Sequence, residues 1–228
     1  MRGMRRVIRP DNLRNGVTAF FTGKVPGADV AEMASLSGIS GSRIYLPIQK
    51  HTDTVQILDA SLDPRIADAV VVHERGVLIG VRVADCVPIL LYDRQRRVAG
   101  AVHAGWRGTA SSILKKTIDV MKMRFSCEPA DIAVAIGPSI RGCCYVVGPE
   151  VSDAVRAASG GDRHPRSMEG KVRIDLASAN RQQALSAGIS EENIWASAEC
   201  TCCNPDKFFS YRYDRGCGGR QAACIGIL

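Results

Sequence analysis

Residues 77–103 read VLIGVRVADCVPILLYDRQRRVAGAVH, and this stretch decides the fold. It contains three apolar runs of strand length, which we expect to be strands of one buried sheet: residues 77–83, 87–92 and 98–103. The polar connection between the second and third runs is short enough for a hairpin, so this pair is predicted to be antiparallel. Cys86 then follows one strand, and His103 ends another.

Beyond this stretch the pattern alternates between helices and strands. A helix is expected next, with Thr109 or Ser111 as its cap, because apolar residues recur at helical spacing from Ile113 to Met121. The remaining predicted elements are strands at residues 132–136, 194–196 and 222–228 and helices at residues 149–158 and 176–187. The sequence therefore predicts an α/β (α+β) fold with mixed strand pairing.

Composition narrows the class of protein. The chain has 228 residues, of which 46% are hydrophobic and 23% charged, and this ordinary globular balance favours a single domain over residues 1–228. The longest apolar runs are too short for a transmembrane helix, so no membrane partner is expected. The basic N-terminus lacks the apolar segment of a signal peptide, which predicts a cytoplasmic location. Nine cysteines in such a chain indicate reduced thiols or metal ligands rather than disulfides.

The net charge of +7 raises the question of an anionic partner. Lysines and arginines are scattered among acidic residues and form no basic stripe, which argues against nucleic acid. A moderately basic protein also suits a small anionic substrate such as phosphate.

Side chains of the kind that bind zinc lie at or near the ends of predicted strands: those of His51, Cys86 and His103. Imidazole nitrogen and thiolate suit a borderline-soft cation, and three protein ligands with a fourth position open are typical of a catalytic site. A bound metal would lower the pKa of a water ligand to near 7. Without a metal, Cys86 and a histidine could instead act as nucleophile and base. The residues alone leave both possibilities open.

Further polar groups lie beside these ligands. Asp85 adjoins Cys86, and Arg107 stands at a strand-to-helix junction, where backbone amides can hold an anion. Arg212 is interleaved with aromatic residues including Tyr211, so this segment could stack on a planar ring or bind phosphate in a bidentate manner.

The other cysteines are ambiguous. If their segment is extended, Cys143 and Cys144 point to opposite faces and do not serve one metal. Cys200 and Cys203 form a Cys-x-x-Cys pair near Cys217, but a closed zinc site needs four ligands and no second such pair follows. Packing is therefore favoured for these thiols.

Taken together, the motifs resemble the YfiH-like family, first described as multicopper polyphenol oxidoreductases (laccases) and now regarded as zinc-dependent purine nucleoside phosphorylases with adenosine deaminase activity. The resemblance runs from about Gln49 to the C-terminus, and residues 1–48 are less typical. It rests on the segments at residues 49–51 (QKH), 84–88 (ADCVP), 102–109 (VHAGWRGT), 137–140 (GPSI), 143–145 (CCY), 200–201 (CT), 208–212 (FFSYR) and 219–220 (GR).

The resemblance implies a mixed-sheet sandwich with flanking helices, a catalytic zinc on His51, Cys86 and His103, and the substrates phosphate and adenosine, inosine, guanosine or methylthioadenosine. By hypothesis, Arg107 or Arg212 holds the phosphate, and Asp85 transfers a proton or orients a partner. The oligomeric state stays open.

Besides a binding protein that turns over no nucleoside, two enzymatic alternatives remain. One is copper at the same site, although four histidines are too few for a multicopper centre. The other is a cysteine hydrolase that edits peptidoglycan precursors, with Cys86 as nucleophile and His103 as base.

Overall fold

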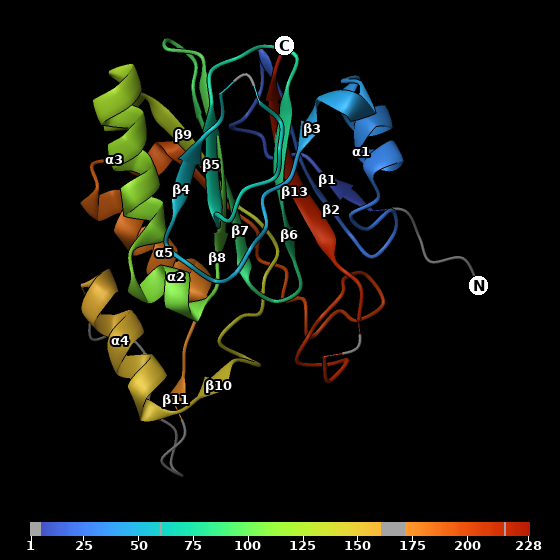
Figure 1. The fold of residues 1–228 in the computed structure, drawn as a ribbon. Helices are drawn as coiled ribbons and strands as arrows, with labels where there is room; N and C mark the ends of the chain where they lie inside the picture. The colour runs from blue at the N-terminus through green and yellow to red at the C-terminus, as the bar shows by residue number, and fades with distance from the viewer. Residues whose placement is uncertain (1–5, 60, 161–171, 217) are drawn as a thin grey trace.

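Two β-sheets packed face to face, with helices on both outer sides, make up the protein (Figure 1). The computed structural model describes residues 6–59, 61–160, 172–216 and 218–228. One helix, α1 (Val30–Ser37), lies against the outer face of a five-stranded sheet. The outer side of a six-stranded sheet is covered by α2 (Trp106–Ala110), α3 (Ile113–Phe125) and α5 (Leu176–Ser186), and α4 (Pro149–Ser159) packs against α2 and α5. The predicted mixed α/β sandwich with flanking helices is confirmed.

The five-stranded sheet joins distant parts of the chain. Its strand order is β1-β2-β13-β6-β3, and β13 pairs antiparallel with both β2 and β6, while β3 pairs parallel with β6. The strands are β1 (Val7–Ile8), β2 (Val17–Thr22), β3 (Ile44–Tyr45), β6 (Leu78–Val83) and β13 (Gln221–Ile227). The C-terminal strand therefore lies at the centre of this sheet, beside the early strand β2.

The six-stranded sheet carries the predicted hairpin. Its order is β12-β9-β7-β8-β5-β4, with β7 and β8 antiparallel along their whole length as expected. Parallel pairs, β12 with β9 and β4 with β5, lie at its two edges. The strands are β4 (Val55–Ile57), β5 (Ala69–Val72), β7 (Val87–Asp93), β8 (Val98–Ala104), β9 (Ile132–Ile136) and β12 (Ile194–Ala196). A separate short pair is formed by β10 (Val146–Val147) and β11 (Val172–Arg173).

The prediction that residues 77–103 form strands of one sheet is wrong. β6 belongs to the five-stranded sheet, whereas β7 and β8 belong to the six-stranded sheet. The chain changes sheet at the turn before β7, where Asp85 has a φ of 81°. The apolar runs do not reveal this, because β7 is buried on both faces: Ile89 and Leu91 face the helices, and Leu90 and Tyr92 face the other sheet.

The expected helix cap is also wrong. A short helix, α2, begins directly after Gly105, and Thr109 is buried within it. The Thr109 hydroxyl accepts a hydrogen bond from Asn180 Nδ2 of α5 at 2.9 Å, so it joins two helices instead of capping one. Ser111 ends α2, and α3 starts after Ser112, which has a φ of 56°.

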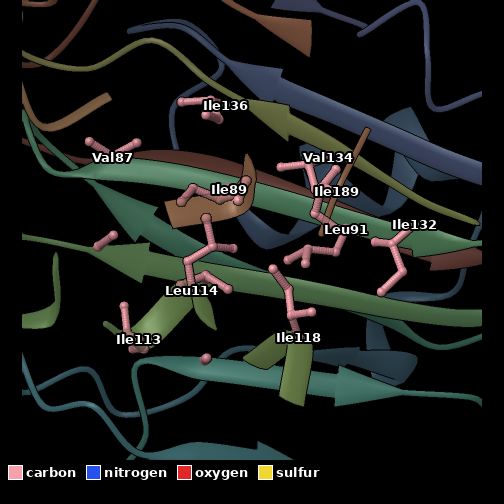
Figure 2. Close-up of a cluster of buried hydrophobic side chains, with 14 of the residues drawn as sticks. Val87, Ile89, Leu91, Ile113, Leu114, Ile118, Ile132, Val134, Ile136 and Ile189 are labelled. Carbon is pink, nitrogen blue, oxygen red and sulfur yellow. The ribbon is translucent and has the colours of Figure 1, made fainter. Parts of the chain in front are cut away.

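A hydrophobic core between the helices and the six-stranded sheet holds in place the strands that carry the predicted site residues. Figure 2 shows side chains of β7, such as Ile89 and Leu91, beside Leu114 and Ile118 of α3. All four are at most 1% exposed, and shortening such a side chain to alanine typically costs about 2–5 kcal/mol. β7 therefore cannot shift easily relative to α3. Across the residues that the structure describes, no helix is long and apolar enough to cross a bilayer.

Candidate metal centre and its pocket

The three predicted metal ligands lie together. One donor atom from each of His51, Cys86 and His103 falls within 4.8 Å of the other two, and Cys86 Sγ is 3.8 Å from His51 Nε2. A tetrahedral zinc ion separates such nitrogen and sulfur donors by about 3.3–3.6 Å, so small side-chain movements close the site around an ion. His103 is 4% exposed and His51 is exposed. The group fits a metal that is open on one side.

Each ligand comes from a different segment. His51 follows β3 in a loop and has a φ of 58°, Cys86 lies in the turn between β6 and β7, and His103 is on β8. Gly105 keeps the following backbone close to them. A Cβ atom at this position would lie 3.0 Å from His51 Cδ2 and 3.1 Å from Cys86 Sγ, so a side chain here would push on two of the ligands.

Asp68 holds several groups of the site in place and was not predicted from the sequence. Its buried carboxylate accepts hydrogen bonds from His103 Nδ1 at 2.7 Å and from the backbone N–H of His51 at 3.1 Å. It also accepts from the backbone and hydroxyl of Thr52, at 2.6 and 2.7 Å, and from the Lys50 backbone at 3.2 Å. A carboxylate on Nδ1 fixes the imidazole tautomer and leaves Nε2 as the metal ligand. The sequence offered one indication of this role: Asp68 is an acidic residue directly before the apolar residues of β5.

The electrostatics favour charged forms of two ligands. Burial opposes ionisation of the Cys86 thiol, but the charge and hydrogen bonds of His103, with help from His51, lower the pKa of Cys86 to about 6. Burial likewise opposes a charged His103, yet Cys86 and Asp68 raise the pKa of that imidazole to about 9. Burial disfavours the Asp68 carboxylate, but hydrogen bonds from His103 and Thr52 hold its pKa well below the usual range. Without a metal, Cys86 and His103 therefore form a thiolate–imidazolium pair near neutral pH.

Asp85 adjoins Cys86, and both of its carboxylate oxygens accept hydrogen bonds. Oδ1 accepts from the Thr201 hydroxyl at 2.6 Å, and Oδ2 accepts from the backbone N–H of Arg212 at 2.7 Å. This buried carboxylate therefore joins the turn at Cys86 to two segments more than a hundred residues further along the chain.

The three candidate metal ligands line a cavity of about 940 Å³, and so do the other predicted site residues. Asp85, Arg107, Tyr211 and Arg212 all line it. Lining residues outside the predicted set include Arg82, Trp106, Tyr145 and Arg220. The cavity thus combines one acidic side chain with several guanidinium groups and aromatic rings, a setting that suits an anionic ligand with a planar part.

The two predicted arginines differ in how they are held. Arg212 donates to the backbone oxygens of Cys144 at 3.4 Å and Val146 at 3.2 Å, and its guanidinium lies 5.4 Å from the centre of the Tyr145 ring. Arg107 lies over the ring of Trp106, at 4.4 Å, and forms an ion pair with no carboxylate of the described chain. Neither arginine pairs with a carboxylate in the described residues, but Arg107 also donates no hydrogen bond there, so its guanidinium is the freer of the two to bind a ligand.

A second group of cysteines corrects the interpretation of the isolated thiols. Cys143 and Cys144 lie in a turn and not in an extended segment, and their Sγ atoms are 3.5 and 3.2 Å from Cys203 Sγ. Cys200 completes a cluster of four, whose sulfur atoms all lie within 4.8 Å of one another. Cys143 and Cys144 were expected to point apart only in an extended segment, and that condition is not met; Cys217 lies outside the described residues.

Comparison with known proteins identifies the family. The model of the family described as "multi-copper polyphenol oxidoreductase laccase" matches residues 27–228. The chain belongs to this family. The predicted YfiH-like resemblance is confirmed, and the match begins before Gln49, where the recognisable motifs start. The crystal structure of the hypothetical protein YfiH of Bacillus licheniformis is similar, with 29% identity, a TM-score of 0.85 and 93% of each chain covered.

Relatives in this YfiH-like family have names that refer to purine chemistry. A Geobacillus stearothermophilus protein named purine nucleoside phosphorylase YlmD is 40% identical over 162 residues, which are 70% of this chain and 59% of that protein. A protein named adenosine deaminase RL5, from an unknown prokaryotic organism, is 36% identical over 195 residues, covering 79% of this chain and 73% of its own length. The chain therefore matches less than two thirds of the Geobacillus relative's length.

Proposed function

We propose that this protein is a zinc-dependent purine nucleoside phosphorylase. It cleaves adenosine, inosine, guanosine or methylthioadenosine with phosphate, and it also deaminates adenosine. The observation that carries the proposal is the cavity in which His51, Cys86 and His103 lie together with Arg107 and several aromatic rings. The names of the relatives, purine nucleoside phosphorylase and adenosine deaminase, support the same substrate class.

His51, Cys86 and His103 would hold the zinc ion. Two imidazoles and one thiolate with an open fourth position are a donor set that zinc accepts in catalytic sites. When bound, zinc supplies Lewis acidity and lowers the pKa of a water ligand to near 7. Asp68 holds the Nδ1 side of His103, so that Nε2 faces the ligand group.

Arg107 is proposed to bind the phosphate because, unlike Arg212, its guanidinium donates no hydrogen bond to the described residues. In phosphorolysis, a phosphate oxygen forms a bond to the anomeric carbon while the bond from that carbon to the purine nitrogen breaks. Bidentate binding by a guanidinium would aim the phosphate at the anomeric carbon. Arg212 and Tyr211 line the same cavity and would contact the nucleoside, with Tyr211 stacking on the planar base.

Asp85 is proposed to act through Arg212. Because its two oxygens accept from Thr201 and from the backbone of Arg212, it orients the segment that carries the guanidinium, which favours the orienting role over proton transfer.

The test is a turnover assay on the zinc-loaded protein. Adenosine, inosine, guanosine and methylthioadenosine are each incubated with and without phosphate, and the products are separated by chromatography. We expect free base only with phosphate, and inosine from adenosine without it. The Cys86→Ala variant serves as the matched control. Turnover of none of the four nucleosides would contradict the proposal.

A metal-free cysteine hydrolase is the second candidate, and one observation favours it. Cys86, His103 and Asp68 are arranged as a nucleophile, a base and an orienting carboxylate. In this case an alkylating reagent should modify Cys86 equally in the presence and absence of zinc. Under the zinc proposal, bound metal protects the thiolate, so alkylation followed by mass spectrometry distinguishes the two functions.

Copper chemistry at the same three ligands is the third candidate, because the family description names copper. Copper binds most nitrogen and sulfur sites more tightly than zinc. Metal analysis of protein made without added copper, combined with a phenol oxidation assay, separates a copper enzyme from a zinc enzyme.

A further inference from the structure

Four cysteines outside the catalytic ligand set converge on one point: Cys143, Cys144, Cys200 and Cys203, here called the tetrathiolate cluster. All four sulfur atoms lie within 4.8 Å of one another, with two separations of 3.2 and 3.5 Å. With bonds of about 2.3 Å, a tetrahedral zinc ion places its sulfur ligands about 3.8 Å apart, inside this range. We propose that the tetrathiolate cluster binds a second zinc ion, which is structural.

The arrangement favours a metal over a disulfide. Cys203 Sγ is close to the sulfur atoms of both Cys143 and Cys144, and a disulfide could use only one of them. The backbone N–H of Arg141 donates to Cys200 Sγ at 3.4 Å, and a donor aimed at sulfur stabilises the thiolate form that a metal needs. Soft thiolates in a closed set of four select zinc, and the displaced thiol protons pass to solvent.

The ion would join two loops that build the wall of the catalytic cavity. A β-bridge pairs Ser139 with Cys200, and the Thr201 backbone N–H donates to the Ser139 oxygen at 3.0 Å. The Thr201 side chain reaches Asp85, and Arg212 donates to the Cys144 backbone oxygen. Fixing the cluster would therefore fix the positions of the groups that orient Arg212. The inference rests on this geometry and not on nucleoside turnover.

The first test uses the wild-type protein, purified under reducing conditions with zinc. Metal analysis should give two zinc ions per chain. X-ray absorption at the zinc edge should then show an average of about 2.5 sulfur and one imidazole ligand per ion, because five thiolates and two imidazoles are shared by two ions. One zinc per chain, with one sulfur and two imidazole ligands, would overturn the proposal without affecting the catalytic site.

The second test uses three variants. Cys203→Ser should keep one zinc, with the ligand set of two imidazoles and one sulfur, whereas Cys86→Ala should keep one zinc with four sulfur ligands. Cys202→Ser is the matched control, because Cys202 lies in the same turn but outside the cluster. It should keep both ions. Circular dichroism checks the fold of each variant, and the wild-type spectrum decides the question if Cys203→Ser does not fold.

Cobalt substitution distinguishes the two sites by charge-transfer absorption, which is stronger for four thiolates than for one. Loss of the strong band in Cys203→Ser, and its retention in Cys86→Ala, would support the proposal. Two zinc ions in Cys203→Ser would contradict it, as would a disulfide between Cys144 and Cys203 in non-reducing mass spectrometry of the wild-type protein. Failure of the nucleoside assay alone leaves these readouts unchanged.

Discussion

Replacing Asp68 by asparagine should weaken metal binding although Asp68 is not a ligand. Its two carboxylate oxygens accept five hydrogen bonds at 2.6–3.2 Å, from His103, His51, Lys50 and Thr52. Asparagine keeps the shape but offers one oxygen and one N–H₂ group. Whichever way the amide turns, it presents N–H₂ to groups that also donate. When this group faces Nδ1, His103 is driven toward the tautomer that carries its proton on Nε2, which cannot bind metal.

The expected size follows from these contacts. Removing a partner of this kind from a metal-ligating histidine typically lowers affinity about 10- to 100-fold, or about 1.4–2.7 kcal/mol. Unsatisfied buried donors cost about 1–3 kcal/mol of folding free energy in addition, which corresponds to a fall in Tm of about 2–12 °C for a chain of this size. The Asp68 charge also contributes to the raised pKa of His103, so its loss reduces competition from protons. The comparison is therefore made near pH 9, where that competition is weak.

The assay is competition for zinc with a chelator of known affinity, combined with thermal unfolding of the metal-free protein. Asp53→Asn is the matched control, because Asp53 pairs with Lys116 at the surface. An exposed pair contributes about 0–1 kcal/mol, so this control should bind zinc like the wild type. If Asp68→Asn also binds zinc with unchanged affinity near pH 9, the role assigned to Asp68 is wrong.

Other predictions concern the ligands and the phosphate. Cys86→Ala should lose both the catalytic metal and turnover, and an unchanged rate in metal-depleted buffer would refute the metal role. Zinc affinity should rise about tenfold per pH unit between pH 6 and 9, because binding displaces the proton of His103. Below pH 6 the affinity should change more steeply with pH, because Cys86 is also protonated there. Titration calorimetry in several buffers counts the protons released on binding. Gly105→Ala should lower zinc affinity by crowding His51 and Cys86, as chelator competition would show. Arg107→Gln should raise the KM for phosphate at least tenfold, with a smaller effect on the KM for nucleoside, and equal effects on both would contradict a phosphate contact.

The candidate metal ligands could be predicted from the sequence because residue type and local position already carry the information. His103 ends an apolar strand, and Cys86 lies between two such strands. Side chains at strand ends commonly meet at the same edge of a sheet, so ligands of the same chemical class at these positions are expected to converge. The β7–β8 hairpin was predicted for a similar local reason, namely a short polar connection between apolar strands.

The assignment of strands to sheets could not be predicted in the same way. β6 and β7 are both apolar and separated by three residues, yet they belong to different sheets. A strand buried on both faces has the same sequence pattern whether its neighbour in the chain pairs with it or packs across from it. What decides the outcome is the backbone turn at Asp85, and its positive φ is uncommon for a residue other than glycine.

Asp68 was not predicted, and of the tetrathiolate cluster only the Cys200–Cys203 pair was noted, because the other partners are distant in the sequence. Asp68 lies 35 residues from His103, and Cys143 lies 60 residues from Cys203, so no local spacing marks either relation. Neighbouring side chains such as those of Cys143 and Cys144 point to opposite faces only in an extended segment, whereas the turn in which they lie lets them point the same way. That turn connects the Gly-Pro break after β9 to Tyr145 in the cavity wall. Two structural features therefore share one cause: the chain folds back at residues 142–144, which brings the thiols together and places Tyr145 beneath the Arg212 guanidinium.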